Sequence, residues 1–264
     1  MAGISARNGL GGLGHWGDRA IDCLVTLVCW GWFTLGFILF FSWRYLATAL
    51  LVKDREVHFQ RLNSQFYRIF FRIVRATAPR HRLEIDEQVE AIRSSVIVCN
   101  HLSYLDPLLL IALFPRQRTI VKTRFFTVPI FGWIIAGAGY LPATSEGPFA
   151  RMMVRQMETM APYLRAGGNL FIFPEGTRSR NGRIGDLNRG AFKIARICRA
   201  PIYVLEIRNT DKLFTPGKFV FNTRMDNRIS VRIIDRIEPD YRHNPPSTAE
   251  LERRVRQAYS ERQT

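Results

Sequence analysis

Motifs that bind metal ions are absent from this 264-residue sequence. There are only four cysteines, no two of which form a CxxC pair or show zinc-finger spacing, and neither HxxxH nor HExxH occurs. Two of the cysteines, Cys23 and Cys29, lie in an apolar run, which favours a reducing, cytosolic environment over a disulfide framework. We therefore expect no metal and no tightly bound cofactor.

Acidic residues are also scarce, with 22 Asp and Glu against 38 Lys and Arg, and the formal net charge is +16. Such a surface concentrates anionic partners: nucleic acid, anionic lipid, coenzyme A or an acidic carrier protein. The basic residues are spread along the chain, and no RNA-recognition or zinc-finger signature is present, so we expect an anionic membrane and no nucleic acid. A non-catalytic basic protein that binds membranes remains an alternative.

The N-terminal part is dominated by apolar residues. Residues 23–43 carry no charge, and after Arg44 the apolar character resumes as far as Val52, a run long enough to cross a bilayer. We expect an uncleaved anchor; the alternative is a signal peptide cleaved near Ala49. Residues 59–82 follow as a basic amphipathic segment, which predicts a helix lying in the headgroup layer, with an ordinary core helix as the alternative. The positive charge after the anchor places the rest of the chain on the cytoplasmic side.

Beyond residue 83 short β-branched runs alternate with helical stretches. We expect strands at 95–99, 119–121, 169–173, 201–207, 218–222 and 229–234, and helices at 107–114, 148–164, 189–199 and 248–262. The fold class is α/β, with a mixed, mostly parallel sheet flanked by helices and an N-terminal membrane-anchoring helical element. Residues 125–145 are uncharged, but Pro and Gly interrupt them, so we interpret them as an acyl-chain wall or membrane contact rather than a second span.

Two strand ends carry polar groups. The first block, residues 96–107, places His101 and Asp106 in a turn after an apolar strand, where a carboxylate can orient an imidazole that acts as general base. Asp106 before Pro107 is alternatively a helix N-cap. In the second block, residues 169–180, Gly176 permits a positive φ and Arg178 offers a planar fork for a phosphate. An exposed turn is the alternative there.

Together these blocks resemble two motifs of the lysophosphatidate acyltransferase family, the PlsC-like glycerolipid acyltransferases. The Asn100-His101-x-Ser103-x-x-Asp106 block is similar to the first motif, and residues 173–179 (FPEGTRS) are similar to the third. Lys122, Pro129 and Gly132, and residues 200–202 are weaker matches to the second and fourth motifs. The resemblance covers roughly residues 83–210.

The resemblance implies that His101 is the base, that Asp106 orients it, and that Glu175, Gly176, Thr177 and Arg178, together with Lys122, bind the head group of the acceptor. It further implies direct transfer of an acyl group from acyl-coenzyme A or acyl carrier protein, without an acyl-enzyme intermediate. The acceptor would be the free hydroxyl of 1-acyl-glycerol-3-phosphate, as in phospholipid biosynthesis at the cytosolic face of the cell inner membrane.

The second motif departs from the family pattern, since Thr144 and Ser145 stand where an acidic residue and an Arg are usual, and Arg189 precedes Gly190 where a Lys is usual. A different lyso-lipid acceptor, such as a lyso-aminolipid, therefore remains open. The expected organisation is a tail (1–20), membrane-anchoring and interfacial helices (21–82), an acyltransferase α/β domain (83–243) and a C-terminal helix (244–264).

Overall fold

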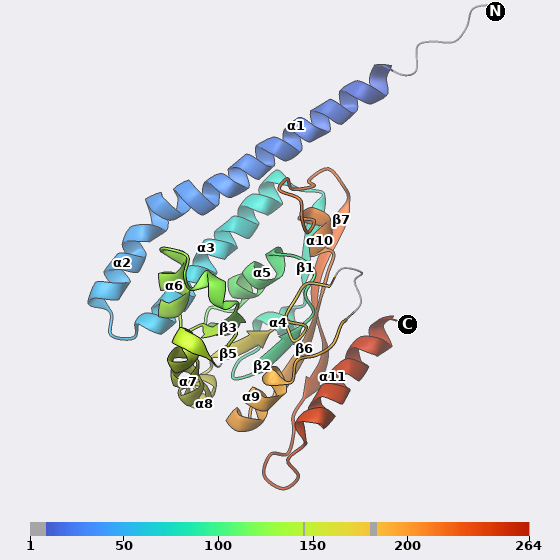
Figure 1. The fold of residues 1–264 in the computed structure, drawn as a ribbon. Helices are drawn as coiled ribbons and strands as arrows, with labels where there is room; N and C mark the ends of the chain where they lie inside the picture. Colours follow the sequence, from blue (N-terminus) through green and yellow to red (C-terminus); the bar gives the residue numbers. More distant parts are fainter. Residues whose placement is uncertain (1–8, 145, 180–183, 264) are drawn as a thin grey trace, which may run out of the picture.

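A seven-stranded sheet forms the centre of the protein (Figure 1). The computed structural model describes residues 9–144, 146–179 and 184–263. In this part of the chain the strand order is β1-β7-β6-β2-β5-β3-β4; β6 and β7 are antiparallel, and every other pair is parallel. The expected mixed, mostly parallel sheet is confirmed. Its strands are β1 (His81–Ile85), β2 (Val96–Cys99), β3 (Gln117–Val121), β4 (Leu141–Pro142), β5 (Asn169–Ile172), β6 (Ile202–Arg208) and β7 (Asn227–Ile237).

Both faces of the sheet are covered by helices. Side chains alternate along each strand, so apolar residues point to both faces and each face needs a covering layer. On β2, Ile97 and Cys99 join one apolar core, while Val96 and Val98 join the other. The first core contains α3 (Arg55–Thr77), α5 (Leu105–Leu113) and α6 (Phe131–Gly137), and the second contains α8 (Met160–Arg165), α9 (Gly190–Cys198) and α11 (Thr248–Gln263). Shorter elements connect them: α4 (Glu87–Glu90), η2 (Thr123–Phe125), η3 (Gly147–Phe149), α7 (Ala150–Glu158) and α10 (Thr210–Leu213).

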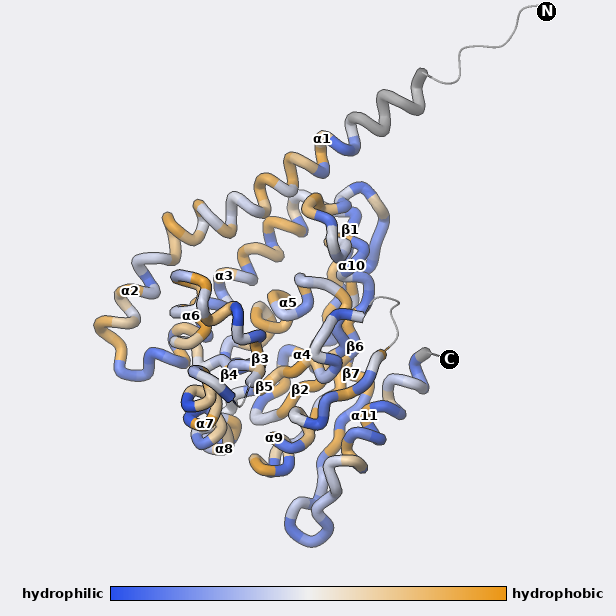
Figure 2. The backbone as a smooth tube through the Cα atoms, viewed as in Figure 1, coloured by the Kyte–Doolittle hydropathy of each residue, from blue (hydrophilic) through white to orange (hydrophobic). Residues whose placement is uncertain are grey.

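The N-terminal apolar run forms one long helical segment, made of α1 (Gly9–Gly31), the π-helix η1 (Trp32–Phe41) and α2 (Ser42–Leu51). It crosses the first core layer, and α3 returns beside it (Figure 1). Its inner face packs on the protein through Cys29, Phe41 and Tyr45, which are buried. The outer face is apolar and exposed (Figure 2). Residues 17–51 are long and apolar enough to cross a membrane, by length and composition alone.

The interpretation of residues 59–82 as a headgroup-layer helix is wrong. The helix α3 begins at Arg55 and ends at Thr77, and the chain then enters strand β1 at His81. Its apolar side chains, including Phe59, Phe66 and Phe70, are buried within the protein. The amphipathic pattern is therefore that of a core helix whose basic face meets solvent, the alternative that the sequence left open.

A strand expected at residues 218–222 is not present. The segment instead packs on α1: the Phe219 ring stacks on Trp30 at 5.4 Å between centroids, and the Phe221 amide donates to Thr26 Oγ1 at 2.9 Å. Asp22 accepts two further hydrogen bonds from Thr223. This apolar segment thus packs on a helix about 200 residues away in the sequence instead of pairing with a strand. The local sequence pattern could not predict these contacts.

The other expected strands and helices are found with small shifts at their ends. The helix expected at 148–164 is divided into η3, α7 and α8, with a turn at Thr159. Strands β1 and β4 were not expected, since β1 is rich in charge and β4 has only two residues. Residues 125–145, as far as they are described, form α6 and β4 rather than a second long helix.

Candidate active site

His101 and Asp106 meet in the loop between β2 and α5. The imidazole Nδ1 lies 2.9 Å from Asp106 Oδ2, while Nε2 has no hydrogen-bond partner among the described residues. Asp106 is fully buried, and the His101 side chain is 16% exposed. A buried carboxylate bound at Nδ1 fixes the tautomer in which Nε2 carries a lone pair. The imidazole is thus arranged to accept a proton at Nε2.

The carboxylate of Asp106 also organises the loop around it. Its Oδ2 accepts hydrogen bonds from the backbone amides of Leu102 and Ser103 at 2.5 and 2.8 Å. Asp106 lies in the first turn of α5 rather than at the N-cap position, which Tyr104 occupies. The N-cap interpretation of Asp106 is therefore wrong, since the side chain turns back to the loop that carries His101.

The end of strand β5 holds the other side of His101. The Phe173 ring stacks on the imidazole at 4.3 Å between centroids, and the Ser179 amide donates to the His101 carbonyl at 2.7 Å. Glu175 Oε1 accepts from the His101 amide at 3.2 Å and its Oε2 from the Gly185 amide at 3.1 Å. Burial raises the pKa of Glu175, and these two amides oppose the shift. Both carboxylate oxygens of Glu175 therefore bind backbone.

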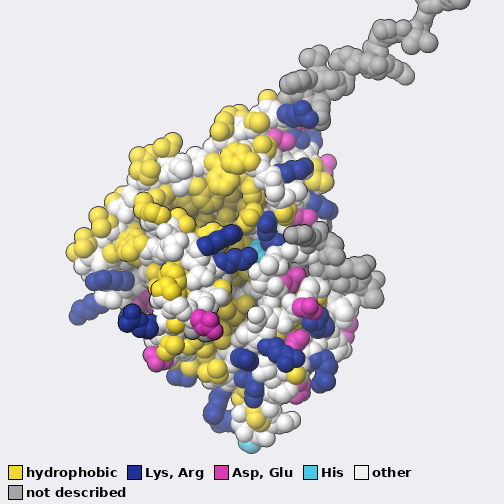
Figure 3. Space-filling view, in the orientation of Figure 1, with side chains coloured by type: hydrophobic (Ala, Val, Ile, Leu, Met, Phe, Trp, Pro, Cys, Tyr) yellow, Lys and Arg dark blue, Asp and Glu magenta, His cyan; other side chains and the backbone are white. Residues whose placement is uncertain are grey.

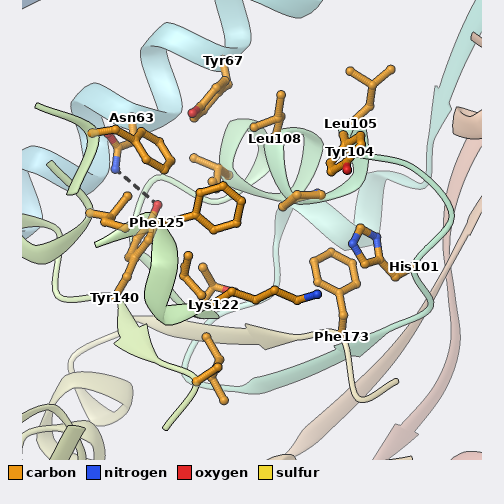
Figure 4. Close-up of a pocket in the computed structure, with 18 of the residues that line it drawn as sticks. Asn63, Tyr67, His101, Tyr104, Leu105, Leu108, Lys122, Phe125, Tyr140 and Phe173 are labelled. Carbon is orange, nitrogen blue, oxygen red and sulfur yellow. Dashed lines mark hydrogen bonds between the residues drawn. The ribbon is translucent and has the colours of Figure 1, made fainter. Parts of the chain in front are cut away.

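His101 opens into a large apolar cavity of about 1750 Å³ (Figure 4). Leu108, Phe125 and Tyr67 line the cavity, and in Figure 4 the end opposite His101 contains Asn63, whose Nδ2 donates to the Tyr140 hydroxyl at 3.3 Å. Side chains from the N-terminal helices complete the lining: Trp30, Phe33, Thr34, Phe37, Ile38 and Tyr45. Figure 3 shows the apolar hollow beneath this helical segment, with Lys and Arg side chains on its lower margin.

Three cationic side chains lie on the cavity wall. These are Lys122 and Arg124, on either side of Thr123, and Arg178, and none forms an ion pair with another described residue. Figure 4 shows the Lys122 amino group pointing toward Phe173 and His101. The Arg178 guanidinium lies 3.7 Å from the centroid of the Tyr104 ring and donates to the Tyr104 hydroxyl at 3.0 Å. Its Nη1 is buried without a hydrogen-bond partner among the described residues.

The structure brings most of the sequence-derived candidates together. Gly176, with φ of +66°, and Thr177 line the same cavity as His101, Lys122 and Arg178, whereas the Glu175 side chain does not line it. Arg189 lies elsewhere and pairs with Glu252 of α11 at 2.8 Å. Ser145 and Arg180 fall outside the described residues. Sequence reasoning missed Tyr104, which lies inside the first block, and Arg124, which lies between Lys122 and Pro129; only the fold shows that both line the cavity.

Comparisons with known proteins point to one family. Residues 80–208 match the family model described as Acyltransferase, and this segment contains His101, Asp106, Lys122 and Arg178. This segment, just under half of the chain, is therefore similar to the acyltransferase family. Among its relatives is the chloroplastic 1-acyl-sn-glycerol-3-phosphate acyltransferase of Brassica napus, 34% identical over 122 residues, which are 46% of this chain and 35% of that protein.

Two further comparisons found proteins with similar names. The enzyme of the same name from Saccharomyces cerevisiae is 29% identical over 160 residues, which cover 59% of this chain and 52% of its own. The crystal structure of PlsC from Thermotoga maritima, a 1-acyl-sn-glycerophosphate acyltransferase, shares the fold with a TM-score of 0.67 and 20% identity, over 91% of this chain and 94% of that one. The chain spans less than two fifths of the Brassica napus enzyme and of a second chloroplastic 1-acyl-sn-glycerol-3-phosphate acyltransferase, from Arabidopsis thaliana.

Proposed function

We propose that this acyltransferase transfers a fatty acyl group from acyl-coenzyme A or acyl carrier protein to the free hydroxyl of 1-acyl-glycerol-3-phosphate. The observation that carries the proposal is the His101–Asp106 pair, with Nε2 facing an apolar cavity large enough for acyl chains. The names of the relatives give the acceptor. The cationic groups on the cavity wall supply the charge that a phosphate needs.

The proposed reaction is a direct transfer. Nε2 of His101 accepts the proton of the acceptor hydroxyl as its oxygen attacks the thioester carbonyl, and the resulting tetrahedral oxyanion collapses to the ester. The thiolate leaves and takes the proton from the imidazolium, so that a lyso-lipid and a thioester become a diacyl lipid and a thiol. The carboxylate of Asp106 stabilises the imidazolium between these two steps. Cys99 takes no part, because it is buried and burial raises its thiol pKa well above the ordinary value.

The phosphate of the acceptor is proposed to bind Lys122, Arg124 and Arg178. These side chains lie on the same cavity as His101 and are not neutralised by carboxylates of the described residues. The second motif of the family usually contains an Arg where this chain has Ser145. Arg124, close to Lys122 in the same motif, is proposed to supply the positive charge instead. Gly176 and Thr177 border the same region; the Thr177 hydroxyl is proposed to bind the head group, whereas the Gly176 amide donates to the Phe173 carbonyl at 3.1 Å. Glu175, bound to two backbone amides, would shape this loop rather than touch the lipid.

A membrane location is proposed from the outer face of the N-terminal helical segment. Leu39, Trp43 and Leu50 on that face are at least 62% exposed, which is unfavourable in water and favourable in acyl chains. The inner face of the same segment lines the cavity, so a lipid acceptor could enter the site from the bilayer. The positive charge that follows the segment favours the cytosolic face of the inner membrane.

The experiment that tests this function is acyl transfer by membranes that contain the protein, measured across a panel of lyso-lipids at matched concentration. We expect 1-acyl-glycerol-3-phosphate to be used most efficiently, with Asp106→Asn membranes as the inactive control. If a lyso-aminolipid or another lyso-lipid without a phosphomonoester is used and lysophosphatidate is inert, the acceptor assignment is wrong while acyl transfer stands. If no thioester and no acceptor in the panel gives product, the proposed function is wrong.

A further inference from the structure

The end of β6 and the segment that follows it hold the His101 loop at three points, two of which lie beyond residue 208, where the matched family segment ends. Asn100 forms a pair of hydrogen bonds with Ile207: its Oδ1 accepts from the Ile207 amide at 2.7 Å, and its Nδ2 donates to the Ile207 carbonyl at 2.8 Å. Ser103 Oγ donates to the Phe214 carbonyl at 2.9 Å. Between these two points Thr210 Oγ1 donates to Asp106 Oδ1 at 2.5 Å.

The Thr210 contact differs from the other two because it reaches the carboxylate itself. Asp106 Oδ2 is occupied by the imidazole and by two amides of its own loop, so the Thr210 hydroxyl is the donor that holds the second oxygen, Oδ1. Thr210 and Asp106 are both fully buried. A hydrogen bond to a buried charged group restricts both the position and the rotation of that group.

The backbone around Thr210 is shaped to make this contact. Asn209 has φ of +64°, a left-handed conformation that Asn tolerates better than most residues, and its side chain donates to the Arg228 carbonyl at 2.8 Å. The turn ends β6 and begins α10 at Thr210, so the hydroxyl lies under the His101 loop rather than along the sheet. The antiparallel strand β7 thus fixes the turn through Arg228.

We propose that Thr210 is a positioning residue for acyl transfer, which fixes the Asp106 carboxylate and through it the Nε2 atom of His101. This inference rests on the proposed function. It assigns a part in the reaction to a residue 104 positions beyond Asp106 and outside residues 80–208. Thr210 does not touch the substrate; it limits how far the carboxylate can turn when the imidazole becomes charged.

The test compares Thr210→Val and Thr210→Ser with wild type in the full-length, membrane-bound protein. Removing a hydrogen bond to a charged group predicts a fall in kcat of roughly tenfold or more, with KM for the acceptor changed less than about threefold. Serine keeps the hydroxyl and is expected to restore most of kcat. If valine prevents folding, Thr210→Cys, which keeps the size but donates weakly, is expected to show the same loss of kcat.

Thr223→Val is the matched control, because it removes a second Thr–Asp hydrogen bond of 2.5 Å, to Asp22 of α1, and neither of these residues lines the cavity. We expect it to lower the melting temperature without lowering kcat. Wild-type kcat in a folded Thr210→Val protein, or a serine variant as slow as the valine variant, would overturn the inference while leaving acyl transfer by wild type intact. An inactive wild type would instead refute the proposed function.

Discussion

The loops that carry the chemistry and the wall that encloses the cavity are built in different ways. Residues 100–106 and 173–179 follow neighbouring parallel strands and are held by hydrogen bonds, mostly to backbone. The wall is assembled by aromatic packing between α1, η1, α2 and α3, as in the Phe33–Phe70 and Phe41–Phe66 contacts. Changes in the loops should therefore alter the rate of reaction. Changes in the wall should alter which acyl chains are accepted and how tightly the protein binds membranes.

The largest effect is expected from Asp106→Asn, on the side of the loops. The variant loses the carboxylate that orients His101, and its amide must present a donor to groups that themselves donate. We expect kcat/KM to fall roughly 10² to 10⁴-fold while membrane association is unchanged. Asp235→Asn, on strand β7, is the control and should stay near wild type. Equal losses in membrane binding and activity would remove the distinction between the loops and the wall.

The outer face of the wall provides the next test. We expect wild-type protein to stay in membranes at high salt and to leave only with detergent, because screening does not weaken apolar burial. Replacing the exposed Leu39 and Trp43 by Glu should weaken vesicle binding about 1000-fold, since burying each apolar side chain contributes on the order of 2 kcal/mol. Activity toward a detergent-dispersed acceptor should persist. Full release of wild type by salt would contradict this account.

Arg178→Ala tests whether a cation on the cavity wall binds the acceptor phosphate. If Arg178 binds the acceptor phosphate, kcat/KM for lysophosphatidate should fall about 10- to 150-fold. This range corresponds to a barrier raised by about 1.5 to 3 kcal/mol. Arg189→Ala removes an exposed arginine that pairs with Glu252, and such a pair contributes about 0 to 1 kcal/mol. We expect little change there. Equal effects of the two substitutions would show that general charge, not a phosphate site, matters.

The smallest effect is expected for Leu108→Trp, which adds bulk to the cavity wall. Kinetics with a long and a short acyl donor should show a drop of about tenfold with the long chain and a smaller drop with the short one, since overpacking costs about 1 to 3 kcal/mol. Ile197→Trp, on the opposite face of the sheet and 69% exposed, is the control. Uniform loss with both donors would mean that Leu108 supports the fold rather than bounding a chain.

Much of the fold and of the site could be predicted from the sequence, because the relevant signals are local. The block around His101 and Asp106 joins an apolar strand to a helix within twelve residues, and parallel strands bring it beside residues 173–179. The burial of α3 could not be predicted, since an amphipathic helix looks alike whether its apolar face meets a core or a bilayer. Residues 218–222 and Thr210 depend on partners more than 100 positions away, which no local pattern encodes.

The most direct test of the account is acyl transfer by a purified, folded His101→Ala protein. Without Nε2 there is no base to accept the hydroxyl proton, and we expect kcat/KM to fall about 10² to 10⁴-fold, with an unchanged melting temperature and unchanged vesicle binding. Turnover near the wild-type rate in that variant would contradict the proposed mechanism.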